Sequence, residues 1–303
     1  MTRYAFGLTL STLVALGVAW PVSFLTPVLA CAFLAAPKAL PLRGAIGFVG
    51  IIAVACASAL LLCNTLQYPG VFFPLSALGL FLIQYAQQRG GNPIATMWFT
   101  VAWVLIPFMG VQSMAVASLI AGALLFGTTV AIVLVWCAFM LFPDPEQTVT
   151  ARPAPTPAIG DPSQHFAAAL RNTLAVLPAF MVFHLSELTS HALVLIFVAL
   201  LSGQPAFQKG FKGGAVLLLG NGIGGIGAVI IFNLLTVAPS MGFLALLIAF
   251  ASLWFGARSF SDQKTAPLFK TGMSTLLLIV GSATTSTGEA GALVYTRLAQ
   301  LAV

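Results

Sequence analysis

The stretch LLLGNGIGGIG, Leu217 to Gly227, contains the pattern G-x-G-x-x-G at Gly222, Gly224 and Gly227. In a dinucleotide-binding domain this pattern follows a strand, begins an amphipathic helix and precedes an acidic residue about 20 positions later. Here no Asp or Glu occurs between Leu188 and Ser261, and the residues after the glycines, AVIIFNLL, are apolar on every face. The sequence therefore argues against a nucleotide-binding turn.

The same glycines have the spacing of a packed membrane helix. Gly220, Gly224 and Ala228 are four residues apart and share one helical face. Small residues on such a face let a second helix backbone approach closely. Gly44 and Gly47 begin an earlier apolar run in a similar way. We therefore expect these five residues to pack helices.

The composition predicts a membrane protein. Of the 303 residues, 60% are hydrophobic and 6% are charged, whereas a soluble domain carries about 25% charge. The mean hydropathy is +1.06. Because a bilayer core needs about 20 apolar residues per helix, we expect an all-α polytopic protein with about 12 transmembrane helices. The predicted spans are 5–20, 22–36, 44–63, 71–87, 95–110, 114–142, 166–183, 188–203, 213–235, 240–257, 267–283 and 287–303. The short first, second, seventh and eighth spans could instead form tight hairpins.

The basic residues predict the orientation. All of them except Arg297 fall on one side of the predicted spans, whereas the opposite connections, such as NTLQYPG and GVQS, carry no Lys or Arg. By the positive-inside rule the basic side is cytoplasmic, so both termini are expected inside, in a bacterial inner (plasma) membrane. The basic residues are neither clustered nor interleaved with exposed aromatics, so nucleic acid is not an expected partner.

The chain divides into two similar halves. A Pro-rich stretch, residues 143–165, is expected to be a cytoplasmic linker between six-helix repeats at 1–142 and 166–303. Arg43 aligns with Lys212 and Arg89 with Arg258 at one offset (212 − 43 and 258 − 89, both 169). Because each half has an even number of spans, the repeats are expected to be parallel.

Four stretches carry a resemblance to a known family: RYAFGLTLSTLVALG, PLRGAIGFVG, FKGGAVLLLGNGIGG and YTRLAQLAV. In these pieces the chain resembles the fusaric-acid-resistance and aromatic-acid-exporter superfamily, as a short branch without the cytoplasmic domain of the longer members. The resemblance implies an inner-membrane exporter of aromatic carboxylic acids or related organic anions. The resemblance also implies that the exporter functions together with a periplasmic adaptor protein of the membrane-fusion type.

Several side chains are candidates for substrate binding. Arg297 lies about eight residues into the last apolar run, at a depth of about 12 Å, where it could bind a carboxylate or snorkel to the cytoplasmic surface. Arg43 and Lys212 recur between the halves and either set the topology or line a vestibule that attracts anions. Trp98, with Trp103, could stack on an aromatic substrate.

The stretch HLSELTSH is the candidate for proton coupling. His184, Glu187 and His191 are three and four residues apart and would share a helical face. This stretch could equally be a solvated turn on the external side. Glu289 is a further candidate, although its charge would also suit the start of the last helix. Neither a P-loop nor a buried nucleophile–base pair occurs, so no cofactor, metal or enzymatic activity is expected.

Three functions remain open. The first is a proton-driven exporter of organic anions that alternates its site between the two halves. The second is a passive anion channel, which needs no coupling acid. The third is a non-transporting membrane subunit that anchors the adaptor of an efflux assembly. A homodimer is an open possibility, because glycine-rich faces can also pack between subunits.

Overall fold

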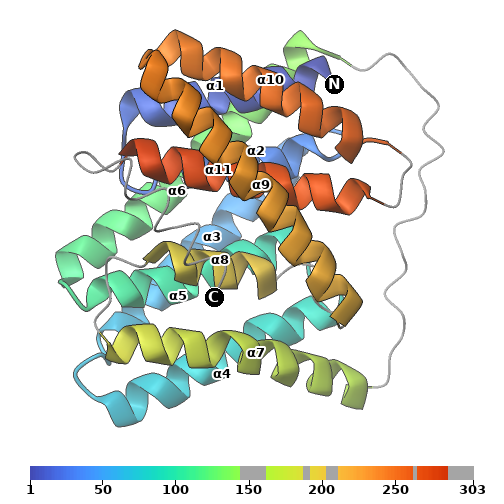
Figure 1. Cartoon of the computed structure of the whole chain (residues 1–303). Coiled ribbons are helices and arrows are strands. Elements are labelled where there is room, and N and C mark those ends of the chain that lie inside the picture. The colour runs from blue at the N-terminus through green and yellow to red at the C-terminus, as the bar shows by residue number, and fades with distance from the viewer. Residues whose placement is uncertain (144–161, 187–191, 203–210, 262–264, 286–303) are drawn as a thin grey trace. The chain divides into compact units, whose positions relative to one another are not determined.

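A computed structural model describes the chain except residues 144–161, 187–191, 203–210, 262–264 and 286–303 (Figure 1). The described residues form eleven helices and no strand. The helices are α1 (Thr2–Val18), α2 (Leu25–Leu34), α3 (Leu42–Cys63), α4 (Pro69–Gln88), α5 (Pro93–Gly110), α6 (Met114–Leu141), α7 (Pro162–Leu185), α8 (Ala192–Ser202), α9 (Phe211–Val237), α10 (Met241–Ser259) and α11 (Ala266–Thr285). Among these, 8 are long and apolar enough to cross a membrane.

Each of these helices overlaps one of the first eleven predicted spans, and the twelfth span lies outside the described residues. The all-α fold and the membrane class follow from these apolar helices. The predicted hairpins fit in part. Helices α1, α2 and α8 are short, with 17, 10 and 11 residues. Helix α7 has 24 residues and is long enough to cross the bilayer.

Local chemistry fixes several helix ends. Proline occupies the first helical positions of α4 and α5, where its missing N–H has no intrahelical partner to lose. The Asn92 side chain accepts a hydrogen bond from Ile94 N (3.0 Å) at the start of α5. Ser240 accepts one from Phe243 N (3.2 Å) at the start of α10. These caps keep the connections between successive helices short.

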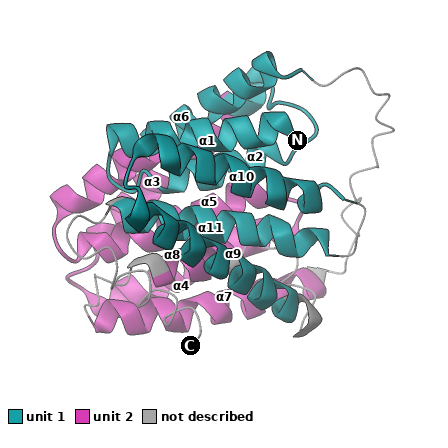
Figure 2. Cartoon of the chain, turned by 45° about the horizontal axis from the view of Figure 1, so that its top comes forward, with its two compact units in different colours: residues 1–45, 126–143, 211–303 teal, residues 46–125, 144–210 magenta. Residues whose placement is uncertain are grey.

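The helices group into two compact units (Figure 2). The first unit comprises residues 1–45, 126–143 and 211–303, and the second comprises 46–125 and 144–210. In the first unit α1 packs on α2 and α10, and α11 packs on α2, α9 and α10. In the second unit α5 packs on α4 and α8, and α7 packs on the same two helices. Neither unit is a continuous stretch of chain.

Each unit combines helices from both halves of the sequence. The offset that aligns Arg43 with Lys212 carries α1 and α2 onto α7 and α8, and α3 to α5 onto α9 to α11. The contact of α1 with α10 in the first unit thus corresponds to that of α7 with α4 in the second. The contact of α2 with α11 likewise corresponds to that of α8 with α5. Each unit contains the first two helices of one half and helices from the middle of the other.

The glycines of the opening stretch lie in the interior of α9, where this helix crosses α11. A Cβ added to Gly224 would clash with the carbonyl oxygen of Gly272, and one on Gly220 would lie 2.9 Å from that of Leu268. Ala228 is fully buried on the same face. Only a residue without a side chain allows this approach at Gly224. The motif therefore packs two helices and does not begin one.

The glycines of α3 have different surroundings. A Cβ added to Gly47 would meet nothing within 4 Å, and Gly47 is exposed. The atoms nearest to a Cβ on Gly44 belong to Leu40 and Pro41, which immediately precede α3. No second helix approaches Gly47 closely among the described residues, because it lies on an exposed face of α3 with Ile46.

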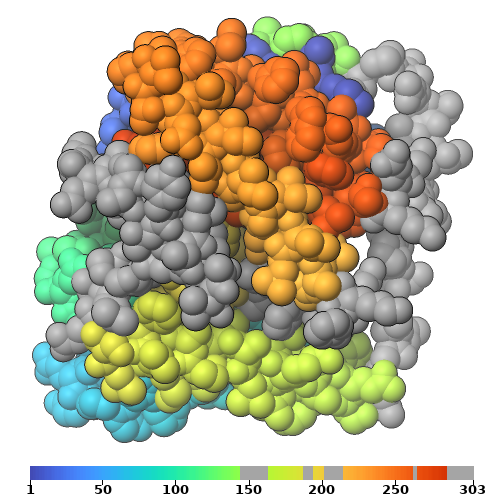
Figure 3. All heavy atoms as spheres, viewed as in Figure 1, coloured from blue at the N-terminus to red at the C-terminus, as the bar shows by residue number. Residues whose placement is uncertain are grey.

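Large apolar side chains cover the exposed faces of several helices, as expected for contact with lipid. The atoms of α7, α9 and α10 can be followed in the space-filling view (Figure 3). On these helices, exposed apolar side chains with at least 40% exposure include Phe166, Leu170, Leu174, Val182, Leu218, Ile226, Ile230, Leu246 and Phe250. Soluble monomeric proteins rarely expose large apolar patches.

Candidate functional site

The antiparallel pair α4 and α7 forms the framework of the candidate site. On each helix, four residues at intervals of four form one row, and such rows interdigitate when helices pack. The rows are Phe72, Ser76, Leu80 and Gln84 on α4, and Asn172, Val176, Phe180 and His184 on α7. All of these side chains are buried except His184, which is half-buried. The first turn of α4 meets the last turn of α7, so Phe72 lies beside His184.

His184 is enclosed by three aromatic rings. Its imidazole stacks on Phe72, with 4.6 Å between ring centroids and 24° between planes. Phe73 meets the imidazole edge-on at 5.6 Å, and Phe180 lies 5.8 Å away on the same helix. The buried Nδ1 atom of His184 has no hydrogen-bond partner among the described residues. One ring nitrogen is thus available to a ligand.

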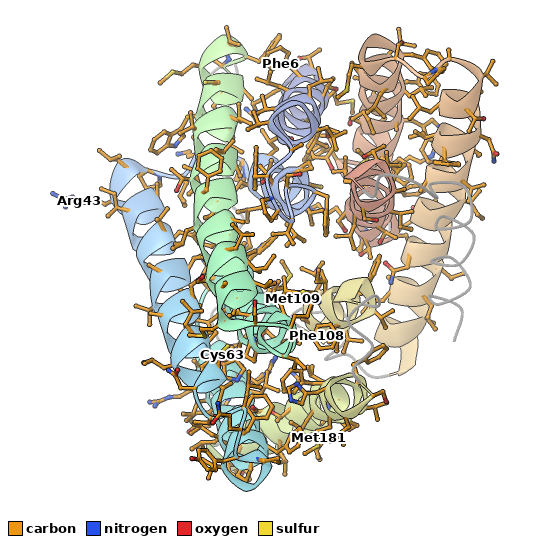
Figure 4. The ribbon with its side chains drawn as sticks, turned by 90° about the vertical axis from the view of Figure 1, so that its left-hand side faces the viewer. Phe6, Arg43, Cys63, Phe108, Met109 and Met181 are labelled. Atoms are coloured by element: carbon orange, nitrogen blue, oxygen red, sulfur yellow. The ribbon has the colours of Figure 1, made fainter. Side chains whose placement is uncertain are left out.

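A cavity of about 610 Å³ adjoins this cluster. The volume is within the range of about 300–1,000 Å³ that small-molecule sites occupy. Asn64 and Gln67, in the α3–α4 turn, bring amide groups to the cavity wall. Figure 4 shows Cys63 at the end of α3 and Met181 on α7. The lining is Cys63, Asn64, Leu66, Gln67, Pro69, Phe72, Phe73, Gly110, Val111, Met114, His184 and Leu185.

A second cavity, of about 590 Å³, occupies the corresponding place in the first unit. Leu16, Leu235 and Met241 line it, at the positions that the offset of 169 assigns to Leu185, Leu66 and Phe72. The same offset places Ala15 where the second unit has His184. The two cavities match in place and size, but among their described lining residues a histidine occurs only in the second unit.

The two tryptophans proposed from the sequence lie on α5 of the second unit. The indole Nε1 of Trp103 donates to the carbonyl oxygen of Ser76 (3.2 Å), and its ring lies against Gly79. Trp103 is therefore engaged in packing α5 on α4. Trp98 is 3% exposed, and its indole N–H has no hydrogen-bond partner among the described residues. Neither residue lines the cavity beside His184.

Several basic residues lie near helix ends. Arg43 projects from the start of α3 and is exposed (Figure 4). Arg3 and Arg258 each lie over an aromatic ring, with 3.9 Å from the guanidinium carbon to the centroids of Phe139 and Trp254. Such placement suits side chains at a membrane interface. Lys212 is in the first turn of α9, and its side chain is outside the described part of the molecule.

Three predicted site residues, Arg297, Glu187 and Glu289, lie outside the described residues. The same is true of His191 and of all 6 acidic residues of the chain. The described helices therefore contain no carboxylate side chain. Within them, no group of three or more His, Cys, Asp or Glu residues could hold a metal ion.

Phe72 and Phe73 are the site residues that the sequence reasoning missed. They follow the Pro-Gly pair of YPGVFFP, on the same predicted side of the membrane as HLSELTSH. Two adjacent Phe residues at the start of a span, level with a histidine at the end of another, were the available signal. Their contact could not be inferred, because more than a hundred residues separate them from His184.

Comparison with known proteins adds a family match over the first part of the chain. The family model described as "Protein of unknown function (DUF2955)" matches residues 1–138, from α1 into α6. No curated protein and no solved structure matches the chain. The chain is thus similar, over those residues, to a family whose description gives no activity.

Proposed function

We propose that the protein exports aromatic carboxylic acids or related organic anions across a bacterial inner membrane, and that the His184 cavity is a substrate-binding site. The observation that carries the proposal is the stack of His184 on Phe72 at the wall of a cavity of about 610 Å³. An aromatic substrate has a ring for such a cluster and a carboxylate for polar donors.

The cavity offers suitable partners for both ends of the substrate. Phe73 and His184 can contact a ring edge-on or face-on. The amide groups of Asn64 and Gln67 and the free imidazole nitrogen can donate to a carboxylate. None of the described lining residues is acidic, so none of these repels an anion. By the predicted orientation this cavity opens to the external side, where an exporter releases its substrate.

Proton coupling is assigned to His184 in this proposal. Histidine changes its charge between about pH 5 and 8, so its protonation can alternate with anion binding and release. Glu187 follows three residues later and is the nearest acidic residue in the sequence. The protonated imidazole would hold the anion, and loss of the proton would favour its release.

We further propose that the halves are parallel six-helix repeats whose helices are exchanged between the two compact units. The corresponding pairs α1–α10 and α7–α4 support this arrangement. So do the corresponding cavities of about 590 and 610 Å³. In such a protein, both termini lie in the cytoplasm and a periplasmic adaptor would receive the substrate.

Transport of a labelled aromatic carboxylate into proteoliposomes of the purified protein, with and without a pH gradient, tests the proposal. We expect proton-driven movement by the wild type and its loss in His184→Ala. His184→Phe keeps an aromatic ring but cannot titrate, so it should bind the anion more weakly and lose the effect of the gradient. His165→Ala, at the other end of α7, is the matched control. Full transport by a normally folded His184→Ala variant would contradict the proposal.

A passive anion channel is the second candidate. The observation that favours it is the lack of any carboxylate side chain in the described helices, since a channel needs no coupling acid. Movement of the anion only down its own gradient, at a rate independent of pH, would identify the channel and exclude the exporter.

A further inference from the structure

Two buried amide side chains in the second unit have no hydrogen-bond partner. Gln84 on α4 and Asn172 on α7 are each 0% exposed. Neither the nitrogen nor the oxygen of either side chain meets a partner among the described residues. An unsatisfied amide is costly in a protein interior, and most buried polar atoms are bonded. The buried indole N–H of Trp98 on α5 also has no hydrogen-bond partner among the described residues.

Neighbouring polar residues show how such a cost is usually avoided. The hydroxyl of Thr173, next to Asn172, donates to Ala169 O of its own helix (2.9 Å). The hydroxyl of Ser76 donates to Phe72 O (2.7 Å). A Gln or Asn side chain has two donors and a carbonyl acceptor, so it needs partners beyond its own helix. Gln84 and Asn172 bond neither to each other nor to another described residue, which leaves water or a ligand as their partners.

Ring contacts give the depths of these amides along the α4–α7 pair. Phe72 meets His184 at 4.6 Å between centroids, and Phe81 meets Phe166 at 5.1 Å, so the helices are antiparallel. Gln84 is 12 residues from Phe72, and Asn172 is 12 residues from His184. At about 1.5 Å per residue, both amides lie about 18 Å from the Phe72–His184 level, toward the predicted cytoplasmic end.

The two amides therefore lie at the same level of the rows that end at the His184 cavity. They face each other from α4 and α7 but make no mutual hydrogen bond. Trp98 is five residues from Trp103, whose bond to Ser76 sets the level of α5 against α4. This places Trp98 within about one helical turn of Gln84. Three buried polar groups without a partner among the described residues thus gather at one level of the second unit.

We propose that Gln84 and Asn172 line a water-accessible path through the second unit and donate hydrogen bonds to the carboxylate of the anion on its way to the His184 cavity. Only the identity of the anion rests on the proposed function. The amide N–H groups suit a carboxylate in transit because they are neutral and do not hold it as a fixed cation would.

Cysteine labelling tests the path independently of transport. In a variant without native cysteines, Gln84→Cys and Asn172→Cys should react with a small water-soluble thiol reagent at least about tenfold faster than Thr173→Cys. An aromatic carboxylate such as benzoate should slow the reaction. Labelling without protection would keep the path but overturn the role of the aromatic anion. Labelling no faster than at position 173 would overturn the path itself.

Apolar replacements separate a transport role from a structural one. Gln84→Met and Asn172→Leu remove the unsatisfied amides at similar volume, so thermal stability should be unchanged or higher. Transport should fall by about tenfold, the equivalent of one lost hydrogen bond to a charged group. Thr173→Val is the matched control and should transport normally. Variants that lose stability in proportion to transport would show that the amides are structural.

Discussion

Gly79 of α4 makes room for the indole ring of Trp103. A Cβ at this position would clash with the ring, which the hydrogen bond to the Ser76 carbonyl holds in place. The contact fixes α5 against α4 and thereby the wall of the second unit. This glycine is needed for space, since its φ is not among the positive values in the described backbone.

We expect Gly79→Ala to destabilise the protein by about 1–3 kcal/mol, because the added methyl group must displace a buried ring. Gly70→Ala is the control on the same helix, since a Cβ there meets nothing within 4 Å. Thermal unfolding in detergent, followed by circular dichroism, measures both variants. Equal melting temperatures for the two would contradict the packing described for Trp103.

Individual side chains were the least predictable level. His184 was proposed for proton coupling from its spacing to Glu187 and His191, and the structure places it against Phe72 and Phe73, which the spacing did not indicate. Asn172 was not singled out from the sequence, although the structure buries its amide. The sequence gives the polar residues but not their surroundings, because distant helices supply those.

At the scale of the element, α9 offers a comparison within one helix. Gly224 packs directly against the backbone of Gly272, so a Cβ there would clash. A Cβ on Gly222, half a turn away, would meet nothing within 4 Å. The hydroxyl of Thr275 adds a hydrogen bond to Asn221 Oδ1 (2.6 Å) across the same contact. The contact between α9 and α11 thus depends on one face of the helix.

We expect Gly224→Ala to separate α9 from α11 and to lower stability by about 1–3 kcal/mol. Gly222→Ala should be neutral or stabilising by up to about 1 kcal/mol, because alanine favours a helix more than glycine does. Chemical or thermal unfolding of the two purified variants gives the comparison. The reverse order of stability would show that Gly222, and not Gly224, faces the partner helix.

The turns at the two ends of α4 can be used to test the predicted orientation of the chain in the membrane. Gln67 precedes the helix on the predicted external side, and Arg89 follows it on the predicted cytoplasmic side. We expect Gln67→Cys, but not Arg89→Cys, to react with a membrane-impermeant maleimide in cells whose periplasm is open to the reagent. Both variants should react after the inner membrane is permeabilised. Labelling of Arg89→Cys alone in the first experiment would invert the predicted topology.

Helix positions followed well from the sequence. The apolar run 44–63 corresponds to α3, Leu42–Cys63, and the run 95–110 to α5, Pro93–Gly110. Long apolar segments, turn prolines and caps are local features of the sequence, so they can be recognised without knowledge of the tertiary contacts. Helix pairing did not follow, because spans that are apolar on all sides have no polar face to show which side is buried.

At the scale of the whole molecule, each compact unit needs helices from both ends of the sequence. Helix α1 of the first half packs on α10 of the second, and α7 of the second half packs on α4 of the first. No cut between the halves therefore separates the two units. Each unit contains helices from both sides of the stretch 143–165.

We therefore expect two fragments, residues 1–150 and 151–303, to be unstable when each is expressed alone. Co-expression should restore a folded complex, because every contact between α1 and α10 or α4 and α7 joins the two fragments. Co-purification through a tag on one fragment, with transport as a second readout, measures this. Stable, separately purified halves would show that the exchange of helices between units is wrong.

The pairing of α1 with α10 also governs how the chain is made. Residues 19–240 separate the two helices, and a ribosome needs roughly 10–45 s to add them at about 5–20 residues per second. During that interval Tyr4, which lies against Gly256 of α10 in the finished protein, has no α10 to cover it. The insertion machinery or lipid must occupy this face of α1 until the tenth helix enters the membrane, so the packing of the first helix is completed only late in synthesis.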